Sequence, residues 1–191
     1  MAASDVDICN IALAMLEEQR ITSLTESTEQ GRYCNVHYDD ARDFVLRLHP
    51  WNFATRRAAL ARNATAPGFG YGNSFKLPTD PYCLRVISVN DPATPPDWKV
   101  EGRDLLSDEG AVNLVYIGRI IDVTQYDAGF VQTLAHYLAW KLAKPLTGSK
   151  SEAEQKARDF DNIMRRARNV DGAEDVQDGL PTSPFVLEHL S

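Results

Sequence analysis

The sequence of 191 residues lacks long hydrophobic runs and any segment typical of a secretion signal. No window approaches the ~20 apolar residues that a membrane-spanning helix needs. The opening stretch "MAASDVDICNIALAM" has no basic start and no long apolar run of the kind found in signal peptides. We therefore expect a protein that is made in the cytoplasm and has no membrane partner.

Cysteine is scarce, and the histidines are scattered along the chain. The three cysteines and four histidines are Cys9, Cys34, Cys83, His37, His49, His136 and His189. An odd number of widely spaced cysteines gives neither a disulfide framework nor a C-x-x-C metal knuckle. No histidine is followed by a second ligand at the spacing of a metal site. The pattern predicts buried thiols and indicates no metal and no other cofactor.

Positive charge is also in short supply, since 20 Lys and Arg face 27 Asp and Glu and leave a net charge of −7. Such a chain gains no general attraction to phosphate backbones, so specific recognition of nucleic acid is disfavoured. The deficit is uneven, because residues 171–191 hold five acidic residues and no Lys or Arg. With 43% hydrophobic residues the chain can fold unaided.

Apolar residues recur at helical spacing in four segments, two of them in the first 50 residues. The first helix is expected to begin at Ser4, which has Asp7 three residues later as its capping partner. The second is expected to begin at a capping box of Ser27 and Gln30 and to end at Pro50.

The other two helices follow residue 127. The third carries an apolar stripe that starts at Phe130, and Pro145 is expected to break it. The fourth is expected to begin at Ser151, with Glu154 completing its capping box, and to stop at Gly172.

Between residues 64 and 126 the pattern changes to short runs of β-branched and aromatic residues divided by Pro, Gly and Asp. The sequence therefore predicts an α+β fold. Residues 1–63 and 127–170 are expected to form an antiparallel four-helix bundle, and residues 64–126 an inserted small antiparallel β subdomain. Residues 171–191 are expected to form an extended acidic C-terminal arm.

The acidic pairs Glu17/Glu18 and Asp39/Asp40 are the first candidates for acid–base chemistry. Neighbours on a helix point about 100° apart and do not converge on one bond, so a solvated helix face is the favoured interpretation. The glycine-rich "GFGYG" lacks the preceding strand and the G-K-[ST] of a phosphate loop. We predict no catalytic residues.

The stretch "RLHPWNFATRRAAL" admits two interpretations. Arg56, Arg57 and Arg62 beside aromatic residues could clamp nucleic acid, or they could pair with the excess acids while Trp51 and Phe53 close the end of the bundle. The acidity of the chain favours the second. We predict a structural corner formed by Pro50, Trp51 and Phe53.

Several stretches together resemble the tail tubular protein A family, the head-to-tail adaptors of short-tailed bacteriophages (podoviruses). They are "ICNIAL", "RDFVLRLHPWNFATRRAAL", "FKLPTDPYCLRVISV", "WKVEGRDL" and "LVYIGRIIDVTQYDAGFVQTLAHYLAWKLAKPLTGS". The similarity spans roughly residues 6–170, and its motifs are diffuse rather than catalytic.

The resemblance implies a structural protein of the virion, located at the head-tail junction and synthesised in the host cytoplasm. Identical subunits would form a ring, expected to be a dodecamer, between the portal protein and the tubular nozzle of the tail. DNA would pass through its channel during genome ejection without specific binding. The arm would contact the portal through Leu180, Pro181, Phe185, Leu187 and Leu190.

Two alternatives stay open. One is a tail-associated lytic enzyme acting on peptidoglycan or capsular polysaccharide, which needs two carboxylates across a groove. The other is a helical scaffold unrelated to viruses that binds a protein partner through its arm.

Overall fold

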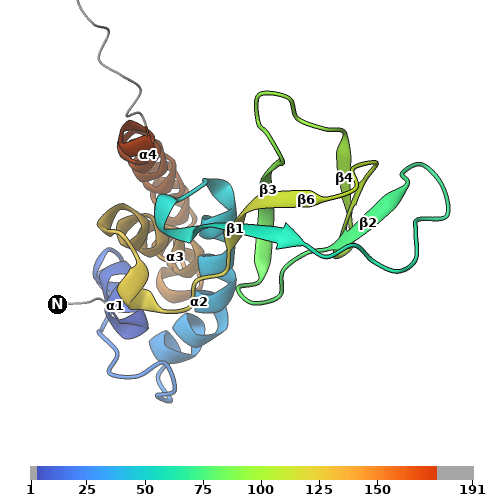
Figure 1. Cartoon of the computed structure of the whole chain (residues 1–191). Coiled ribbons are helices and arrows are strands. Elements are labelled where there is room, and N and C mark those ends of the chain that lie inside the picture. The colour runs from blue at the N-terminus through green and yellow to red at the C-terminus, as the bar shows by residue number, and fades with distance from the viewer. Residues whose placement is uncertain (1–3, 176–191) are drawn as a thin grey trace, which may run out of the picture.

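The computed structural model describes residues 4–175 of the chain. Within these residues four α-helices lie on one side and two small sheets on the other (Figure 1). The helices are α1 (Asp5–Ala14), α2 (Glu29–Leu48), α3 (Ala128–Thr147) and α4 (Lys150–Asp175), with short 3-10 helices η1 (Asn52–Ala54) and η2 (Val123–Gln125). The strands are β1 (Thr55–Leu60), β2 (Asn73–Lys76), β3 (Cys83–Val89), β4 (Trp98–Glu101), β5 (Asp104–Ser107) and β6 (Val112–Gly118).

The strands pair antiparallel in the orders β1-β6-β3 and β2-β5-β4. In Figure 1 the first sheet adjoins the helices and the second lies beyond it. Side chains from both sheets share a core of their own: Phe75, Leu77, Cys83, Val89, Leu105, Val112, Leu114 and Tyr116. The strands begin at Thr55 and end at Gly118, so the β region starts and ends earlier than the predicted 64–126.

The prediction of an α+β protein is correct, but the predicted four-helix bundle with an inserted domain is wrong. α3 packs against α1, α2 and α4, whereas α1 and α2 touch each other only slightly. The same core takes in Leu84 of β3 and Ile117 of β6, so the first sheet completes the helical core.

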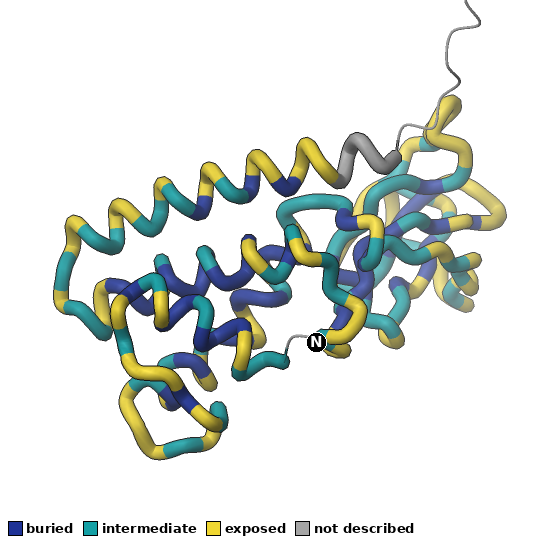
Figure 2. Tube along the Cα trace, turned by 90° about the vertical axis from the view of Figure 1, so that its left-hand side faces the viewer, coloured by how far each residue is buried: buried dark blue, intermediate teal, exposed yellow. Residues whose placement is uncertain are grey.

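The error comes from assigning one apolar stripe to every helix. α3 is buried around most of its circumference, and a helix of that kind must be surrounded rather than placed at a corner of a bundle. Its buried residues are Phe130, Thr133, Leu134, Ala135, Tyr137, Leu138, Ala139, Leu142 and Ala143. α4 lies along the outside of α3, with a buried inner side and a long exposed outer side (Figure 2).

The starts of α1 and α2 differ in how well they follow the sequence signals. The predicted cap of α1 is confirmed, because Ser4 Oγ accepts from Asp7 N and Asp7 Oδ2 accepts from Ser4 N, both at 3.0 Å. The predicted box that begins at Ser27 is wrong. The cap of α2 is Thr28, whose Oγ1 accepts from Gly31 N at 3.1 Å.

The last two helices run longer than predicted. Pro145 lies inside α3 instead of breaking it. It is exposed, as is Lys141, whose carbonyl the proline leaves without its helical donor, so water can replace that bond. α3 ends at Thr147, and its C-cap, Gly148, has a left-handed φ of 69°. α4 begins at Lys150, one residue earlier than predicted, and continues past Gly172 to Asp175, five residues into the predicted arm.

Candidate functional site

The end of α2 is where the helices and the first sheet are joined. The last carbonyls of a helix have no partner within it, and Pro50 prevents the helix from supplying one by continuing. Side chains from the following corner, from β3 and from α4 donate to them instead. The pairs are Trp51 Nε1 to Val45 O (3.1 Å), Arg85 Nη1 to Arg47 O (2.7 Å) and Arg168 Nη2 to Leu48 O (3.2 Å).

The two arginines also bring positive charge to the negative end of the helix dipole, which stabilises the contact further. Because the donors come from residues 51, 85 and 168, one helix end ties together distant parts of the chain.

Pro50, Trp51 and Phe53 lie at this helix end. The Trp51 side chain is 1% exposed and packs edge-on against Phe130 of α3, with ring centroids 5.2 Å apart. Phe53 is half-buried and contacts both Phe130, at 5.1 Å, and Tyr126, at 5.7 Å. Edge-on pairs of this kind add to the stabilisation that burial alone provides. The corner therefore fixes the start of α3 against the end of α2.

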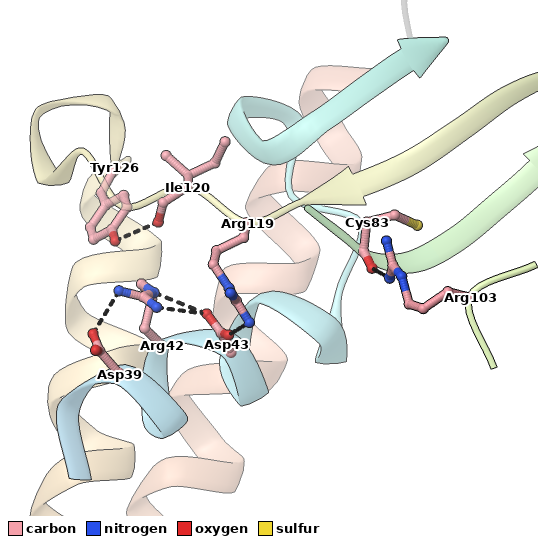
Figure 3. Close-up of polar contacts among 8 residues, drawn as sticks. All are labelled: Asp39, Arg42, Asp43, Cys83, Arg103, Arg119, Ile120 and Tyr126. Carbon is pink, nitrogen blue, oxygen red and sulfur yellow. Dashed lines mark hydrogen bonds and ion pairs between the residues drawn. The ribbon is translucent and has the colours of Figure 1, made fainter. Parts of the chain in front are cut away.

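A chain of charges runs beside the corner (Figure 3). Arg42 of α2 has a side chain only 9% exposed, and it pairs with Asp39 at 2.7 Å and with Asp43 at 3.0 Å. The other oxygen of Asp43 binds Arg119, which follows β6. Asp43 is thus shared by two guanidinium groups, one from the helices and one from the segment that leaves the sheet.

The contacts continue through Tyr82 to the second sheet. The Arg119 guanidinium lies 4.6 Å from the centre of the Tyr82 ring, and the Arg103 guanidinium lies 3.9 Å from it. Arg103, in the turn between β4 and β5, also donates to the carbonyls of Cys83, at 2.8 Å, and Pro78, at 2.6 Å. We call the end of α2, the corner and this chain of charges the joint.

Two groups at or beside the joint, Arg42 and Tyr126, have shifted pKa values. Burial alone would lower the pKa of Arg42, but Asp43 and Asp39 raise it above its ordinary value, so the guanidinium stays charged. Burial raises the pKa of Tyr126 to about 12, and its hydroxyl donates to the Ile120 carbonyl at 2.8 Å. Neither group is prepared to transfer a proton near neutral pH.

The two acidic pairs do not converge on a common point. Glu17 follows the end of α1 in a left-handed conformation with φ of 58°, so it is not on a helix as expected. Glu18 accepts from Gln30 at 2.8 Å. Asp39 belongs to the joint, and Asp40 is exposed on α2.

The basic cluster after the corner is used differently from what the sequence indicated. Arg56 was expected to pair with an acid, but its guanidinium donates to the carbonyls of Phe53, at 2.8 Å, and Thr55, at 3.0 Å. It therefore holds the backbone where the chain passes from η1 into β1. Arg57 is exposed on β1. The backbone of Arg62 pairs with that of Phe75 in an isolated antiparallel β-bridge.

The three cysteines are free and buried, as the sequence predicted. A hydrogen bond with Cys34, together with burial, raises the pKa of the Cys9 thiol far above its ordinary value, so this thiol is unreactive. Among residues 4–175, no three His, Cys, Asp or Glu side chains are grouped so that they could hold a metal ion. No helix in this part of the chain is long and apolar enough to cross a membrane.

Two of the hollows on the surface of the helical part border the joint, and a third, of about 480 Å³, lies between α2, α3 and α4. The first, which we call the Trp51 groove, lies between the start of α3 and the second half of α4 and measures about 440 Å³. Its lining includes Trp51, Gly129, Ile163, Arg166, Ala167 and Val170. The second, the Tyr38 pocket, measures about 220 Å³ and is lined by Asp5, Leu24, Asn35, Tyr38, Asp39, Arg42, Ile121 and Val123.

Sequence reasoning missed the chain of charges in the joint. One signal was present, because Arg42 follows Tyr38 by four residues and so lies on the buried side of α2. A charged residue there requires a partner. Nothing local identified that partner, since Arg119 and Tyr82 come from distant segments. The predicted arm residues Leu180, Pro181, Phe185, Leu187 and Leu190 lie outside the described residues.

The comparisons with known proteins leave the family open. No protein-family model matches the chain, and no curated protein matches it either. The case for a function therefore depends on the geometry above and on the resemblance of the quoted sequence stretches.

Proposed function

We propose that this chain is a structural subunit of a phage head-tail connector, the adaptor ring between the portal protein and the tail nozzle. The resemblance to tail tubular protein A supports this proposal over roughly residues 6–170. The stretch "HPWNF" belongs to that resemblance, and its residues form the corner that holds the joint together.

One observation carries the proposal, namely how the polar and apolar side chains are distributed. The charged groups of the joint bind one another or backbone carbonyls, as Arg42 binds Asp39 and Asp43 and Arg103 binds the Cys83 carbonyl, so these contacts serve the fold. Large apolar side chains meanwhile remain exposed on the helical part: Val36 (66%), Phe44 (43%), Ile121 (69%) and Val170 (64%). They lie on α2, on the segment before η2 and on α4. In a ring, these exposed apolar side chains on separate elements would be available for contacts with different neighbours.

A closed ring requires two unlike surfaces on each subunit, because the contact repeats head to tail. It also requires a fixed angle between the two surfaces, because an angular error in each subunit adds up around the ring. The joint is suited to that need because it connects the helices with both sheets through the buried Trp51–Phe130 contact, the partly exposed Asp43–Arg119 ion pair and the Arg103–Tyr82 contact.

The acidity of the chain fits a conduit for DNA. A wall that neutralises few phosphates releases few counterions and so does not hold DNA in transit. We expect the assembled ring to leave duplex DNA unbound at ~0.15 M salt. Retention of DNA well above ordinary non-specific binding would contradict this part of the proposal.

The portal contact is assigned to the C-terminal arm, on the resemblance and on its sequence. The apolar residues of such an acidic segment can be buried by a partner. Deleting residues 180–191 is therefore expected to leave the fold of residues 4–175 intact and to abolish docking on the portal. Normal assembly of the truncated protein on portals would refute the assignment.

The decisive experiment is the mass of the purified protein with and without its cognate portal, measured by light scattering. We expect a discrete ring, of the mass of a dodecamer, when the portal is present. A protein that remains monomeric at saturating portal is not an adaptor. Digestion of peptidoglycan or capsule by the same sample would instead support the lytic alternative.

A further inference from the structure

We infer that, in a subunit without its portal, residues 180–190 of the C-terminal arm bind in the hollow between α2 and α4 of the same subunit. We call this hollow, of about 480 Å³, the α2–α4 groove. It is lined by Phe44, Leu48, Trp140, Phe160, Asp161, Met164, Arg165 and Arg168. The binding itself does not depend on the proposed function, whereas its release by the portal does.

The groove exists because two helices share a neighbour. α2 and α4 each pack along α3, but they touch each other only slightly. One contact across the groove is the hydrogen bond from Arg168 Nη2 to the Leu48 carbonyl, at 3.2 Å. The hollow therefore has one helix on each side, and Trp140 of α3 lies between them.

Aromatic rings form a continuous cluster along the groove. Phe44 stacks on Tyr137 with ring centroids 4.8 Å apart, Trp140 stacks on Phe160 at 6.0 Å, and Tyr137 meets Trp140 edge-on at 5.6 Å. Phe160 and Met164 are buried, but Phe44 is 43% exposed and Trp140 is only half-buried. The described part of the chain thus leaves aromatic surface uncovered, which favours an apolar occupant.

The charges around the groove favour an occupant that is also acidic. Arg165 and Arg168 are exposed, and Asp161 is the acidic residue of the lining. Arg165 donates to the Asp161 carbonyl and to the Asn162 side-chain oxygen, and Arg168 donates to a carbonyl of α2, so these acceptors are neutral. Lys141 adds a third cation, with its Nζ 4.7 Å from the centre of the Trp140 ring. Three cations therefore surround the hollow against one acid.

The sequence after α4 has the matching composition. Residues 176–191 contain Asp178 and Glu188 but no Lys or Arg, and six of these residues are Val, Leu or Phe. We place Phe185 against Phe44 and Trp140, where an aromatic ring completes the cluster. Glu188 then supplies a carboxylate for the arginines of the groove.

The length of this segment makes the same subunit the occupant that we choose. α4 ends at Asp175, and Arg168 lies about two helical turns, ~10 Å, before that end. The chain from Asp175 to Phe185 spans up to ~33 Å when extended, and it contains Asp178-Gly179, a dipeptide typical of turns. It is therefore long enough to reverse and reach the groove. A short tether also gives the segment an effective concentration in the mM range, far above that of a second copy in dilute solution.

Binding in the groove gives the arm two alternative positions. The residues assigned to the portal contact are held on their own subunit until the portal takes them. Their departure uncovers Phe44, which then becomes available to a neighbour in the ring. This step, unlike the binding, rests on the proposed function.

Photo-cross-linking of the full chain tests the inference directly. Phe185 is replaced by p-benzoylphenylalanine, and equal amounts of ¹⁵N-labelled and unlabelled protein are mixed and irradiated without the portal. We expect cross-linked peptides that join position 185 to residues of the α2–α4 groove, with both peptides carrying the same isotope. The same substitution at Phe69, which is 93% exposed on a loop, is the control and is expected to give no cross-link in the groove.

Each other outcome has a definite meaning. Cross-links only outside the groove, or none, overturn the inference. Peptide pairs of mixed isotope show that a second copy fills the groove, which also overturns it. With the cognate portal added, we expect the cross-links to move from the groove to the portal. Groove cross-links that persist in assembled rings would contradict the portal role of the arm and leave its binding in the groove standing.

A charge exchange provides an independent readout. Glu188→Arg and Arg165→Glu are each expected to lower the yield of groove cross-links about threefold, and the double variant is expected to recover most of the loss. Arg57→Glu, an equal charge change on exposed β1, is the matched control and leaves the yield unchanged. A double variant as low as the two losses combined would exclude the contact between Glu188 and Arg165.

Discussion

Replacing Trp51 by alanine tests how firmly the corner holds the helices to the first sheet. The indole is 1% exposed, so the substitution removes nearly all of its buried surface. Truncations of buried Trp or Phe to alanine cost ~3–5 kcal/mol of unfolding free energy. That total includes the bond from Nε1 to the Val45 carbonyl, ~1 kcal/mol, and the edge-on contact with Phe130, ~1 kcal/mol.

The measurement is urea unfolding followed by circular dichroism, with a thermal scan on the same samples. For a chain of this size a loss of ~3–5 kcal/mol corresponds to a decrease in Tm of about 6–20 °C. Trp51→Phe is the matched control, because it keeps an aromatic ring in the corner but removes the N–H donor. It is expected to cost ~1–2 kcal/mol.

A loss below ~1 kcal/mol for Trp51→Ala would refute the reasoning, because it would mean that the ring contributes little inside the subunit. Equal losses for the alanine and phenylalanine variants would refute the division between packing and hydrogen bonding. A change in the slope of the urea transition would show that the unfolded state had changed instead.

Three further predictions concern the other contacts. Asp43→Ala leaves Arg42 and Arg119 facing each other without their shared carboxylate, and we expect a loss of ~2–3 kcal/mol by urea unfolding; a loss below ~0.5 kcal/mol would contradict the shared role. Hydrogen bonds to the Asp7 carboxylate lower its pKa in the folded state, so the stability it contributes is present above its unfolded pKa and lost as pH falls through the folded one. Asp7→Asn should therefore flatten the acid limb of stability below about pH 4, and an unchanged limb would exclude this role. Gly31→Ala should cost ~1–3 kcal/mol by urea unfolding, since a Cβ there would lie 2.8 Å from a backbone oxygen of the preceding loop; a neutral result would show that this loop moves easily.

Local signals in the sequence identified some features of the fold well. The cap at Ser4, the end of α2 before Pro50 and the burial of the cysteines each depend on a few adjacent residues, and the structure confirms them. The helices were found for the same reason, because their apolar periodicity is local. The ends of α3 and α4 were misplaced, because exposed Pro145 is tolerated and Gly172 does not stop α4.

The arrangement of the elements could not be read in the same way. Whether a helix is covered on one side or on all sides depends on its neighbours. The apolar periodicity of α3 alone indicates a single stripe, so it does not reveal that other elements surround this helix. The joint escaped prediction because its partners are far apart, as with Asp43 and Arg119 or Arg85 and Arg47. No spacing rule connects residues across such separations, so the chain of charges emerged only from the fold.

The shared end of α2 has a consequence for how the molecule opens. The corner, β3 and α4 each donate to a different carbonyl at this helix end, Val45, Arg47 and Leu48 respectively, so loss of the end of α2 removes an acceptor from all three at once. Amide protons near this helix end, in β3 and in the second half of α4 should therefore exchange with solvent in a single concerted event, although some of them lie more than 100 residues apart in the sequence.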